Sequence, residues 1–353
     1  MKLLTINPGS TSTKIAIFDD LNPVCVENIK HSVGDLAPFL QASDQLDYRR
    51  NLVVKTLKDK GISMDFDAIV SRGGLLRPVE GGVYAINDVM LREMEKPTNN
   101  HASCLGCRIA ASIAETIPGC LALIADPCSV DEMDDVARVS GSPLMPRIAF
   151  WHALNQRAIA RRYAAEHNTK YENLNLVIAH LGGGISVGAH RHGRCIDVNN
   201  AFDGDGPFSP ERAGSIHPGA LVDLSYSHRY TRTQLKRRIS GNAGLAAHLG
   251  TTDVAAIVEN IKKGDKKAET ILGGMIFQIA KEIGGAATAL CGKVDAIILT
   301  GGVAFSDYVT DHIRQYVNFL APVHIYPGEN EMLSLAQNGY AALTGELPIR
   351  EYK

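Results

Sequence analysis

Short apolar runs alternate along the chain with longer segments whose apolar residues recur at helical spacing. The short runs predict strands at 2–6, 13–19, 24–30, 67–71, 120–125, 174–180, 185–190, 194–198, 294–300 and 322–326. The longer segments predict helices near 43–60, 99–117, 147–166, 252–263, 267–290, 307–320 and 331–344. In the first of these helices Leu46, Val53 and Leu57 share one face. Because some strands follow one another as hairpins, we expect an α/β protein that departs from a plain parallel order.

The first hairpin carries a polar turn between its two apolar strands. The turn runs from Asn7 to Lys14 and contains Gly9 with several Ser and Thr hydroxyls. Free backbone N–H groups, hydroxyls and an ammonium group together suit a phosphate. The turn leads from strand to strand, so it is neither a Walker A loop nor a dinucleotide fingerprint, since both of these lead into a helix. An ordinary polar hairpin explains the turn equally well.

Two later Gly-rich turns can be compared with the first one. The segment Asn175–Ala189 repeats the order of apolar strand, small-residue turn and apolar strand about half a chain further on, and Gly301-Gly302 joins an apolar strand to a helix. Chance similarity of two hairpins is the alternative to an internal repeat. Three such turns in this order resemble the actin and sugar-kinase superfamily, in which two turns surround the phosphates and the third lies against the adenosine.

Length and composition limit the class of protein. A chain of 353 residues exceeds the usual size of one domain, so we expect two domains, 1–147 plus 332–353 and 148–331. A net charge of -2 without a basic, aromatic-rich patch gives no reason to expect nucleic acid. No apolar run approaches the roughly 18 residues that span a membrane. The N-terminus turns polar at Asn7, before a signal-peptide core could form, which indicates a cytoplasmic protein.

The seven cysteines are an odd number in a long chain, which argues against a disulfide framework. Cys104 and Cys107 have the CxxC spacing of redox and zinc sites. No second pair lies at ligand spacing, however, and apolar residues mark a helical face through the same segment, so packing is favoured over redox or metal chemistry. The remaining cysteines are expected mostly in the core: Cys25, Cys120, Cys128, Cys195 and Cys291.

Three charged residues at the ends of predicted strands or in loops are candidates for chemistry. Arg72 follows a short strand and precedes two glycines, and Arg212 lies in a loop, so both are placed to reach a ligand. For either arginine alone, a surface salt bridge is the stronger alternative. Asp126 ends a strand before a proline, where ligands and Mg²⁺ often bind in open α/β sheets. A turn-initiating role explains Asp126 equally well.

Four further residues are weaker candidates. Glu329 and Glu331 open the last predicted helix, where acids commonly serve only the helix dipole. His180 stands directly before a triple glycine, and His152 lies early on a predicted helix. Either histidine could bind phosphate or complete a core hydrogen-bond network. The spacing of His, Asp and Glu shows no zinc site, and no GxSxG elbow or HExxH helix is present.

In this order, the motifs resemble the acetokinase family, and its butyrate-kinase branch more closely than acetate kinase. The resemblance covers essentially the whole chain, and the matching motifs are Asn7–Lys14, Arg72–Pro78, His180–Ser186, Asp197–Gly214 and Tyr326–Glu331. It implies a two-domain actin/sugar-kinase-like (duplicated ribonuclease H-like) fold with an interdomain nucleotide cleft. It also implies reversible, direct in-line transfer of a phosphoryl group from ATP to a short-chain fatty acid, with Mg²⁺, in a homodimer or larger homo-oligomer.

The resemblance also implies residue roles. The phosphates and metal are surrounded by Asn7, Ser10, Ser12 and Lys14. The carboxylate and the transferring phosphoryl group are held by Arg72 and Arg212 and contacted by His180. Mg²⁺ and substrate are organised by Asp126 and Glu331, with Asn7 as a further metal ligand. The nucleotide is backed by Gly182, Gly183, Gly184, Gly301 and Gly302, with Asp253 near the adenine.

The chain departs from acetate kinases in ways that favour a longer acid. Ala153-Leu154-Asn155-Gln156 follows His152 where acetate kinases carry Gly-Thr-Ser-His, Gly183 replaces an Asn, and Trp151 is bulky. Two alternatives remain on the same superfold. A sugar or polyol kinase needs an Asp to activate a hydroxyl group. The other alternative is an actin-like or chaperone ATPase. A chaperone would need an additional peptide-binding domain, for which the motifs leave little room.

Overall fold

The computed structural model describes residues 1–96 and 102–353, which form two compact units. Unit 1 comprises Met1–Val130 and Asn330–Lys353, and unit 2 comprises Asp131–Glu329. The chain therefore divides after Val130 and after Glu329, whereas the sequence analysis placed the divisions after residues 147 and 331. The first residues of the predicted helix 99–117, 99 to 101, lie outside the described residues.

Unit 1 is built on a sheet in the order β12-β5-β6-β4-β1-β2-β3. Its strands are β1 (Lys2–Pro8), β2 (Ser12–Asp19), β3 (Asn22–Lys30), β4 (Ala68–Arg72), β5 (Val83–Ala85), β6 (Leu121–Ala125) and β12 (Ile349–Glu351). β1 pairs antiparallel with β2 and parallel with β4, and β4 pairs parallel with β6. β1 leads into the first turn, β4 ends directly before Gly73, and β6 ends directly before Asp126. Because these three strands are parallel, their C-terminal ends lie at the same edge of the sheet.

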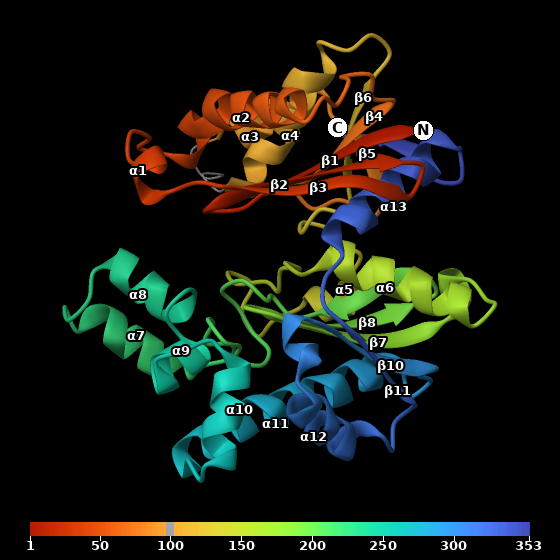
Figure 1. Ribbon diagram of the computed structural model, residues 1–353. Helices are drawn as coiled ribbons and strands as arrows, with labels where there is room; N and C mark the ends of the chain where they lie inside the picture. The colour runs from red at the N-terminus through yellow and green to blue at the C-terminus, as the bar shows by residue number, and fades with distance from the viewer. Residues whose placement is uncertain (97–101) are drawn as a thin grey trace. The chain divides into compact units, whose positions relative to one another are not determined.

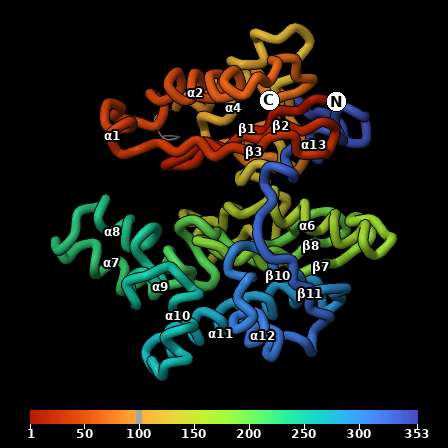
Figure 2. The backbone as a smooth tube through the Cα atoms, viewed as in Figure 1, coloured from red at the N-terminus to blue at the C-terminus, as the bar shows by residue number. Residues whose placement is uncertain are grey.

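Helices cover both faces of this sheet (Figure 1). They are α1 (Val33–Leu36), α2 (Leu46–Asp59), α3 (Asp88–Met94), α4 (Leu105–Ala114) and α13 (Glu331–Leu343), with 3-10 turns at Ala42–Gln45 and Ala102–Cys104. α2 and α4 pack on the face that carries Leu4, Ile6 and Ile69. α13 packs on the opposite face, against Leu3 and Val70. Figure 2 shows this C-terminal helix beside the first strands of the chain, so the two ends of the sequence share one unit.

Unit 2 repeats the strand arrangement of unit 1. Its sheet has the order β11-β10-β7-β8-β9, with β7 (Asn175–Leu181), β8 (Ile185–Arg191), β9 (Arg194–Val198), β10 (Ala296–Gly301) and β11 (Val323–Pro327). β7 pairs antiparallel with β8 and parallel with β10, and β10 pairs parallel with β11. In unit 1 the order β3-β2-β1-β4-β6 follows the same directions. The internal repeat that two hairpins suggested is confirmed over five strands of each unit.

The helices of unit 2 also cover two faces of its sheet (Figure 1). They are α5 (Asp135–Arg138), α6 (Ala153–Glu166), α7 (Pro218–Tyr226), α8 (Arg232–Ile239), α9 (Gly244–Leu249), α10 (Val254–Lys262), α11 (Lys266–Ala289) and α12 (Asp307–Val317), with 3-10 turns at Tyr171–Asn173 and Gly302–Phe305. α10, α11 and α12 pack with Val177, Ala179 and Leu299 in one core. α6 packs on the other face, against Leu176 and Ile178.

All ten predicted strands are present, with ends shifted by at most two residues. The predicted helix 147–166 was wrong at its start, since α6 begins at Ala153. β5 and β12 were missed because three residues are too few to show an alternating pattern. α7 and α8 were missed for a different reason: neither helix has a buried residue, so neither shows a periodic apolar face.

Most cysteines behave as expected. None of the seven, all among the described residues, forms a disulfide, and Cys104 and Cys107 are buried in a core cluster of unit 1. Burial raises the pKa of the Cys107 thiol to about 12, so this side chain is a packing residue rather than a reactive thiolate. The core assignment was wrong for Cys291, which is exposed. Among the described residues, no cluster of His, Cys, Asp and Glu could hold a metal by itself, and no helix is long and apolar enough to cross a membrane.

Candidate active site

The first turn connects β1 to β2 in unit 1. The amide of Gly9 donates to the carbonyl of Ser12 over 2.8 Å, which closes the turn. Ser10 is exposed at its tip, and Lys14 is exposed on β2 directly across from Asn7 on β1. Hydroxyl, ammonium and amide groups therefore lie on one short, accessible segment, as a phosphate turn requires.

Arg49 on α2 lies behind this turn and was not singled out by the sequence analysis. It is fully buried, and its guanidinium donates to the carbonyls of Gly9, Ser10 and Ser12 over 2.8 to 3.1 Å. A usable signal existed in the sequence: Arg49 lies three residues after Leu46, on the apolar face of the predicted helix. A charged residue on an otherwise apolar face indicates a buried polar partner.

Glu331 joins Arg72 to Asn7. The first residue of α13, Glu331, accepts from Arg72 Nη1 at its Oε1 over 2.6 Å and from the Asn7 side-chain amide at its Oε2. Arg72 ends β4 and Asn7 lies near the end of β1, two neighbouring strands. The side chains of Arg72 and Glu331 are only 28% and 18% exposed. Three candidates that stand far apart in the sequence thus form one hydrogen-bonded group beside the first turn.

Asp126 has a different environment from that group. It follows β6 with a positive φ of 38°, is 1% exposed, and accepts from the amide of Gly82 over 2.8 Å while its own amide donates to the Gly82 carbonyl over 2.9 Å. The reciprocal pair ties the loop before β5 to the end of β6. The structure therefore gives Asp126 a loop-holding contact.

The second turn, in unit 2, packs against the loop that carries Arg212. The turn runs through Gly182, Gly183 and Gly184 between β7 and β8. Ser209 Oγ and the amide of Glu211 both donate to the carbonyl of Gly183, over 2.5 and 3.3 Å. A Cβ placed on Gly184 would lie 2.1 Å from Arg212 Nη1. The turn and the arginine that the sequence analysis chose separately are therefore in direct contact, and Gly184 is required by that contact.

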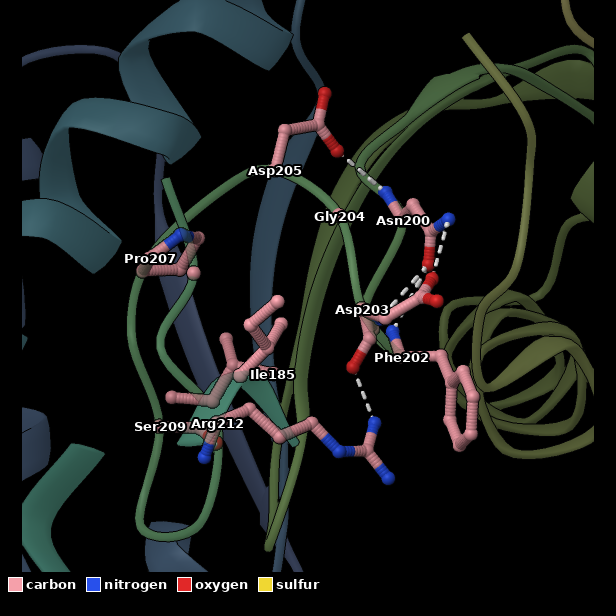
Figure 3. A pocket seen from close by; sticks show the side chains of 12 residues that line it. Ile185, Asn200, Phe202, Asp203, Gly204, Asp205, Pro207, Ser209 and Arg212 are labelled. Carbon is pink, nitrogen blue, oxygen red and sulfur yellow. Dashed lines mark hydrogen bonds between the residues drawn. The ribbon is translucent and has the colours of Figure 1, made fainter. Parts of the chain in front are cut away.

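Arg212 is oriented by two neighbours (Figure 3). Its Nη1 donates to the carbonyl of Ala201, and the guanidinium lies 5.5 Å from the ring centroid of Phe202. These residues belong to an acidic loop in which Asp203 and Asp205 bond to Asn200. The backbone carbonyl of Ala201 and the ring of Phe202 thus help to fix the position of Arg212.

His180 ends β7 beneath the second turn. It is 1% exposed, its Nδ1 lies 2.8 Å from Asn155 Oδ1, and its Nε2 lies 3.2 Å from Glu329 Oε1. Because an amide oxygen only accepts, the proton on Nδ1 is directed to Asn155, which leaves Nε2 for Glu329 or a ligand. The ring of His152 stacks on that of His180, with centroids 3.8 Å apart. Asn155, in the segment that differs from acetate kinases, thus orients a candidate site histidine.

A buried hydrogen-bond chain fixes His152. Gln156 donates its amide hydrogens to the carbonyl and hydroxyl of Ser186, so its oxygen accepts from His190 Nε2 over 2.8 Å. Nδ1 of His190 then accepts from the Tyr171 hydroxyl over 2.6 Å. The remaining Ser186 hydroxyl hydrogen is free for His152 Nδ1 at 2.8 Å. His152 therefore belongs to a core network, one of the two roles expected for it, and the network ends beside His180.

A groove of about 1060 Å³ in unit 2 brings several candidates together. Gly182, Gly183, Gly302 and Asp253 all line it. Residues not chosen from the sequence line it as well, namely Glu211, Glu259, Lys262, Phe305 and Tyr308. Asp253 also caps α10, accepting from the amide of Ala256 over 3.0 Å. Its carboxylate thus has a structural partner at the wall of the groove.

Gly301 has a backbone role next to the groove. Its φ is 89°, and a Cβ there would lie 2.4 Å from the carbonyl oxygen of Leu181. Only glycine combines this left-handed conformation with so close an approach. Gly301 therefore holds the end of β10 against the end of β7, where the second turn begins, while Gly302 faces the groove.

Comparisons with known proteins agree with this arrangement. A model of the acetokinase family matches residues 147–337. The chain is 58% identical over 353 residues to a Bacteroides thetaiotaomicron protein named probable butyrate kinase, with 100% of both chains covered. It is 48% identical over 354 residues to butyrate kinase 2 of Clostridium acetobutylicum, covering 100% of this chain and 99% of the relative.

Among solved structures, the crystal structure of Porphyromonas gingivalis acetate kinase matches with a TM-score of 0.76 at 18% identity, over 97% of this chain and 99% of the other. That likeness confirms the expected two-sheet α/β fold of the actin and sugar-kinase type. The family model matches more than half of the chain, and the identity to full-length relatives is high. The chain therefore belongs to the acetokinase family.

Proposed function

We propose that this protein is a kinase that transfers the terminal phosphoryl group of ATP to the carboxylate of a short-chain fatty acid, with butyrate or a branched analogue preferred. Relatives named butyrate kinase, 58% and 48% identical over the full length, support the acid. One structural observation carries the chemistry: each Gly-rich turn has its own arginine. Arg72 is linked to the first turn through Glu331 and Asn7, and Arg212 touches the second turn at Gly184.

The arginines fit the needs of this reaction. A carboxylate with a pKa near 4 to 5 is already ionised at neutral pH, so the attack on phosphorus needs no general base. The reaction does need cations that reduce the repulsion between an anionic nucleophile and an anionic phosphoryl group. An arginine contact of this kind contributes on the order of 4–7 kcal/mol in GTPases. We assign that role to Arg72 and Arg212, with His180 contacting the phosphoryl group.

A sugar or polyol kinase would require a carboxylate base for a neutral hydroxyl group. Asp126, the acid at the end of β6, is 1% exposed and already accepts from the amide of Gly82. Glu331 is held by Arg72 and Asn7. Both carboxylates already accept hydrogen bonds from protein groups, which does not favour either as a general base. This favours a phosphoryl acceptor that is ionised before it binds.

We propose that the groove of unit 2 receives the adenosine and that each of the two turns is a phosphate-binding turn. Gly182, Gly183 and Gly302 allow the nucleotide to approach the backbone closely, and Gly184 and Gly301 keep the turn in place. The ring of Phe305 is 71% exposed at the groove, where it offers an apolar face to a base. Asp253 is assigned to the adenine end. Ser10, Ser12 and Lys14 are assigned to the phosphates.

The donors near the first turn fit Mg²⁺. Asn7 and Glu331 are oxygen ligands held together by a hydrogen bond, and Mg²⁺ in kinases is typically bound through one or two carboxylates and the substrate phosphates rather than by a complete protein cage. Asn7 and Glu331 would hold the ion, with Asp126 as the third assigned ligand. When bound, Mg²⁺ neutralises charge on the phosphates.

We also propose a cytoplasmic homo-oligomer. The helices α7 and α8 have no buried residue, and Val222 and Tyr226 on α7 are 55% and 78% exposed. Helices of nine and eight residues are marginal in water without packing. A second copy covering α7 would supply that packing, and sedimentation of the Val222→Asp variant would then show a smaller particle than the wild type.

The proposed function is tested by kcat/KM over straight and branched acids of two to six carbons, with glycerol and glucose as comparison acceptors. We expect the highest value for a four- or five-carbon acid and no turnover with glycerol or glucose. Each misplaced methylene should change kcat/KM by about 10- to 200-fold. Faster phosphorylation of a polyol or a sugar than of any acid would overturn the proposal.

A further inference from the structure

The feature that the proposed chemistry leaves unused is the buried guanidinium of Arg49, and it lies directly behind the first turn. The side chain is completely buried although it carries a charge. Its donors go to neutral oxygens only: the carbonyls of Gly9, Ser10 and Ser12, the hydroxyl of Thr13 and the side-chain oxygen of Gln45. No carboxylate among the described residues forms an ion pair with it. Burying a charge without a counter-charge costs free energy, so a purely structural role does not explain why this residue is an arginine.

The neighbouring groups do not cancel this charge. His31 lies 2.9 Å from Thr13 Oγ1 and is 5% exposed, and burial together with Arg49 lowers the pKa of its imidazole. Tyr48 lies 3.5 Å from His31, and burial raises the pKa of its phenol. Both side chains are therefore neutral at physiological pH. Asp35, the carboxylate that acts on both His31 and Tyr48, forms no ion pair with Arg49 among the described residues, so the guanidinium keeps its positive charge behind the turn.

The hydrogen bonds of Arg49 also determine which way the turn faces. The carbonyls of Gly9, Ser10 and Ser12 bond to the guanidinium, and the carbonyl of Thr11 accepts from the amide of His31 over 2.9 Å. All four carbonyls of the turn are thus engaged on the protein side. Within the described part of the chain, no hydrogen bond is donated by the amide of Ser10 or Thr11. These two amides are left for a ligand that only accepts, which is the chemistry of a phosphate.

We propose that Arg49 is the positioning residue of the first phosphate turn: it binds the turn's carbonyls so that the amides of Ser10 and Thr11 face the nucleotide phosphates, and it adds one unneutralised positive charge behind them. Arg49 does not touch the ligand in this arrangement. The inference rests on the proposed function, because it takes the turn to bind the phosphates of ATP and ADP.

The test compares Arg49→Lys and Arg49→Met with Arg50→Met, a matched control on the same helix. Arg50 is the next residue of the helix, its side chain is 36% exposed, and it bonds to Asp47 and Asn51 at the surface. The measurements are KM for MgATP, KM for butyrate, kcat, and the Kd of ADP and of adenosine by calorimetry. Circular dichroism and thermal unfolding show which variants are folded.

We expect Arg49→Met to raise KM for MgATP and Kd for ADP by at least about tenfold, because both the charge and the bonds to the carbonyls are lost. Arg49→Lys keeps the charge but has three donors instead of five, so we expect a rise of at least about threefold. Adenosine affinity, KM for butyrate and all constants of Arg50→Met should stay within about twofold of the wild type. A merely structural role would lower the folded fraction without separating ADP from adenosine.

A folded Arg49→Met protein with ADP affinity and KM for MgATP within twofold of the wild type would overturn the inference. If Arg49→Met does not fold, Arg49→Lys decides by the same two constants. Failure of the proposed function would look different. In that case the wild type itself would form no acyl phosphate, whereas failure of the inference leaves an active wild type whose nucleotide affinity does not depend on Arg49.

Discussion

The contact between Gly184 and Arg212 permits a test in which one methyl group displaces the arginine that we assign to the phosphoryl group. The added Cβ of Gly184→Ala would lie 2.1 Å from Arg212 Nη1, about 1.3 Å short of the 3.4 Å at which ordinary contacts begin. Arg212 Cζ lies 2.6 Å from the same position, and the carbonyl oxygen of Ala201, the acceptor of Arg212 Nη1, lies 3.1 Å from it. The guanidinium must therefore move by roughly an ångström and give up this hydrogen bond.

A displacement of about 1 Å at a group that contacts the transition state can cost about 100-fold in rate, which corresponds to about 2.7 kcal/mol. We expect kcat of Gly184→Ala to fall by that order while the fold persists, since Gly184 is not at a positive φ and the new side chain meets a flexible one. The matched control is Gly183→Ala, compared by kcat at saturating ATP, because Gly183 lines the groove and its substitution is expected to act on nucleotide binding. There the nearest atom is Glu211 Oε2 at 3.3 Å, the end of a side chain that can move by a few tenths of an ångström.

The assay is steady-state formation of acyl phosphate, trapped with hydroxylamine, for the wild type and the two variants. Unfolding midpoints establish that each variant is folded. If Gly184→Ala retains kcat within about threefold of the wild type, or if Gly183→Ala loses as much kcat at saturating ATP as Gly184→Ala does, the reasoning about the position of Arg212 is refuted.

Three further predictions concern the arginine and the buried network. Arg212→Ala should lower kcat by at least about a hundredfold with an unchanged circular dichroism spectrum, and near-normal turnover of the folded variant would contradict its role. Tyr171→Phe leaves the buried Nδ1 of His190 without a donor and should reduce the free energy of unfolding in urea by about 1–3 kcal/mol; a loss under about 0.5 kcal/mol would show that the bond contributes little. Burial lowers the pKa of His190 to about 3, against about 6.5 in the unfolded chain, so only the unfolded chain gains this proton as the pH falls from 6.5. The free energy of unfolding should therefore drop by about 2 kcal/mol between pH 7 and pH 5 on account of His190, and an equal pH slope in His190→Gln would contradict this account.

The sequence predicted the parts of the fold whose pattern is local. Every strand with a long apolar run was found, because buried strands such as β7 and β10 carry uninterrupted apolar runs, Leu176–Ala179 and Ala296–Leu299. The turns at Asn7–Lys14 and Gly182–Gly184 were found because glycine and hydroxyl residues interrupt those runs. β5 and β12 each contribute three residues and complete the sheet only through pairing with distant strands, so no local pattern marks them.

The site was predictable as a set of residues but not as a set of contacts. Glu331 and Arg72 are 259 positions apart, and only the packing of α13 against the first sheet brings them together. The contact of Arg212 with Gly184 depends on a loop without helix or strand pattern. Arg49 could have been found, since it breaks the apolar face of α2. Its role could not be predicted, because the hydrogen bonds from its guanidinium to the carbonyls of the turn are known only from the structure.

The central claim is tested most directly by ³¹P NMR of the products formed from ATP, Mg²⁺ and butyrate. We predict one equivalent of ADP for each equivalent of an acyl phosphate, with no ADP formed when the acid is omitted. The reverse reaction, from that acyl phosphate and ADP, should regenerate ATP. Inorganic phosphate as the only new phosphorus signal besides ADP, at a rate that does not depend on butyrate or any other short acid, would contradict the assignment of this protein as a carboxylate kinase.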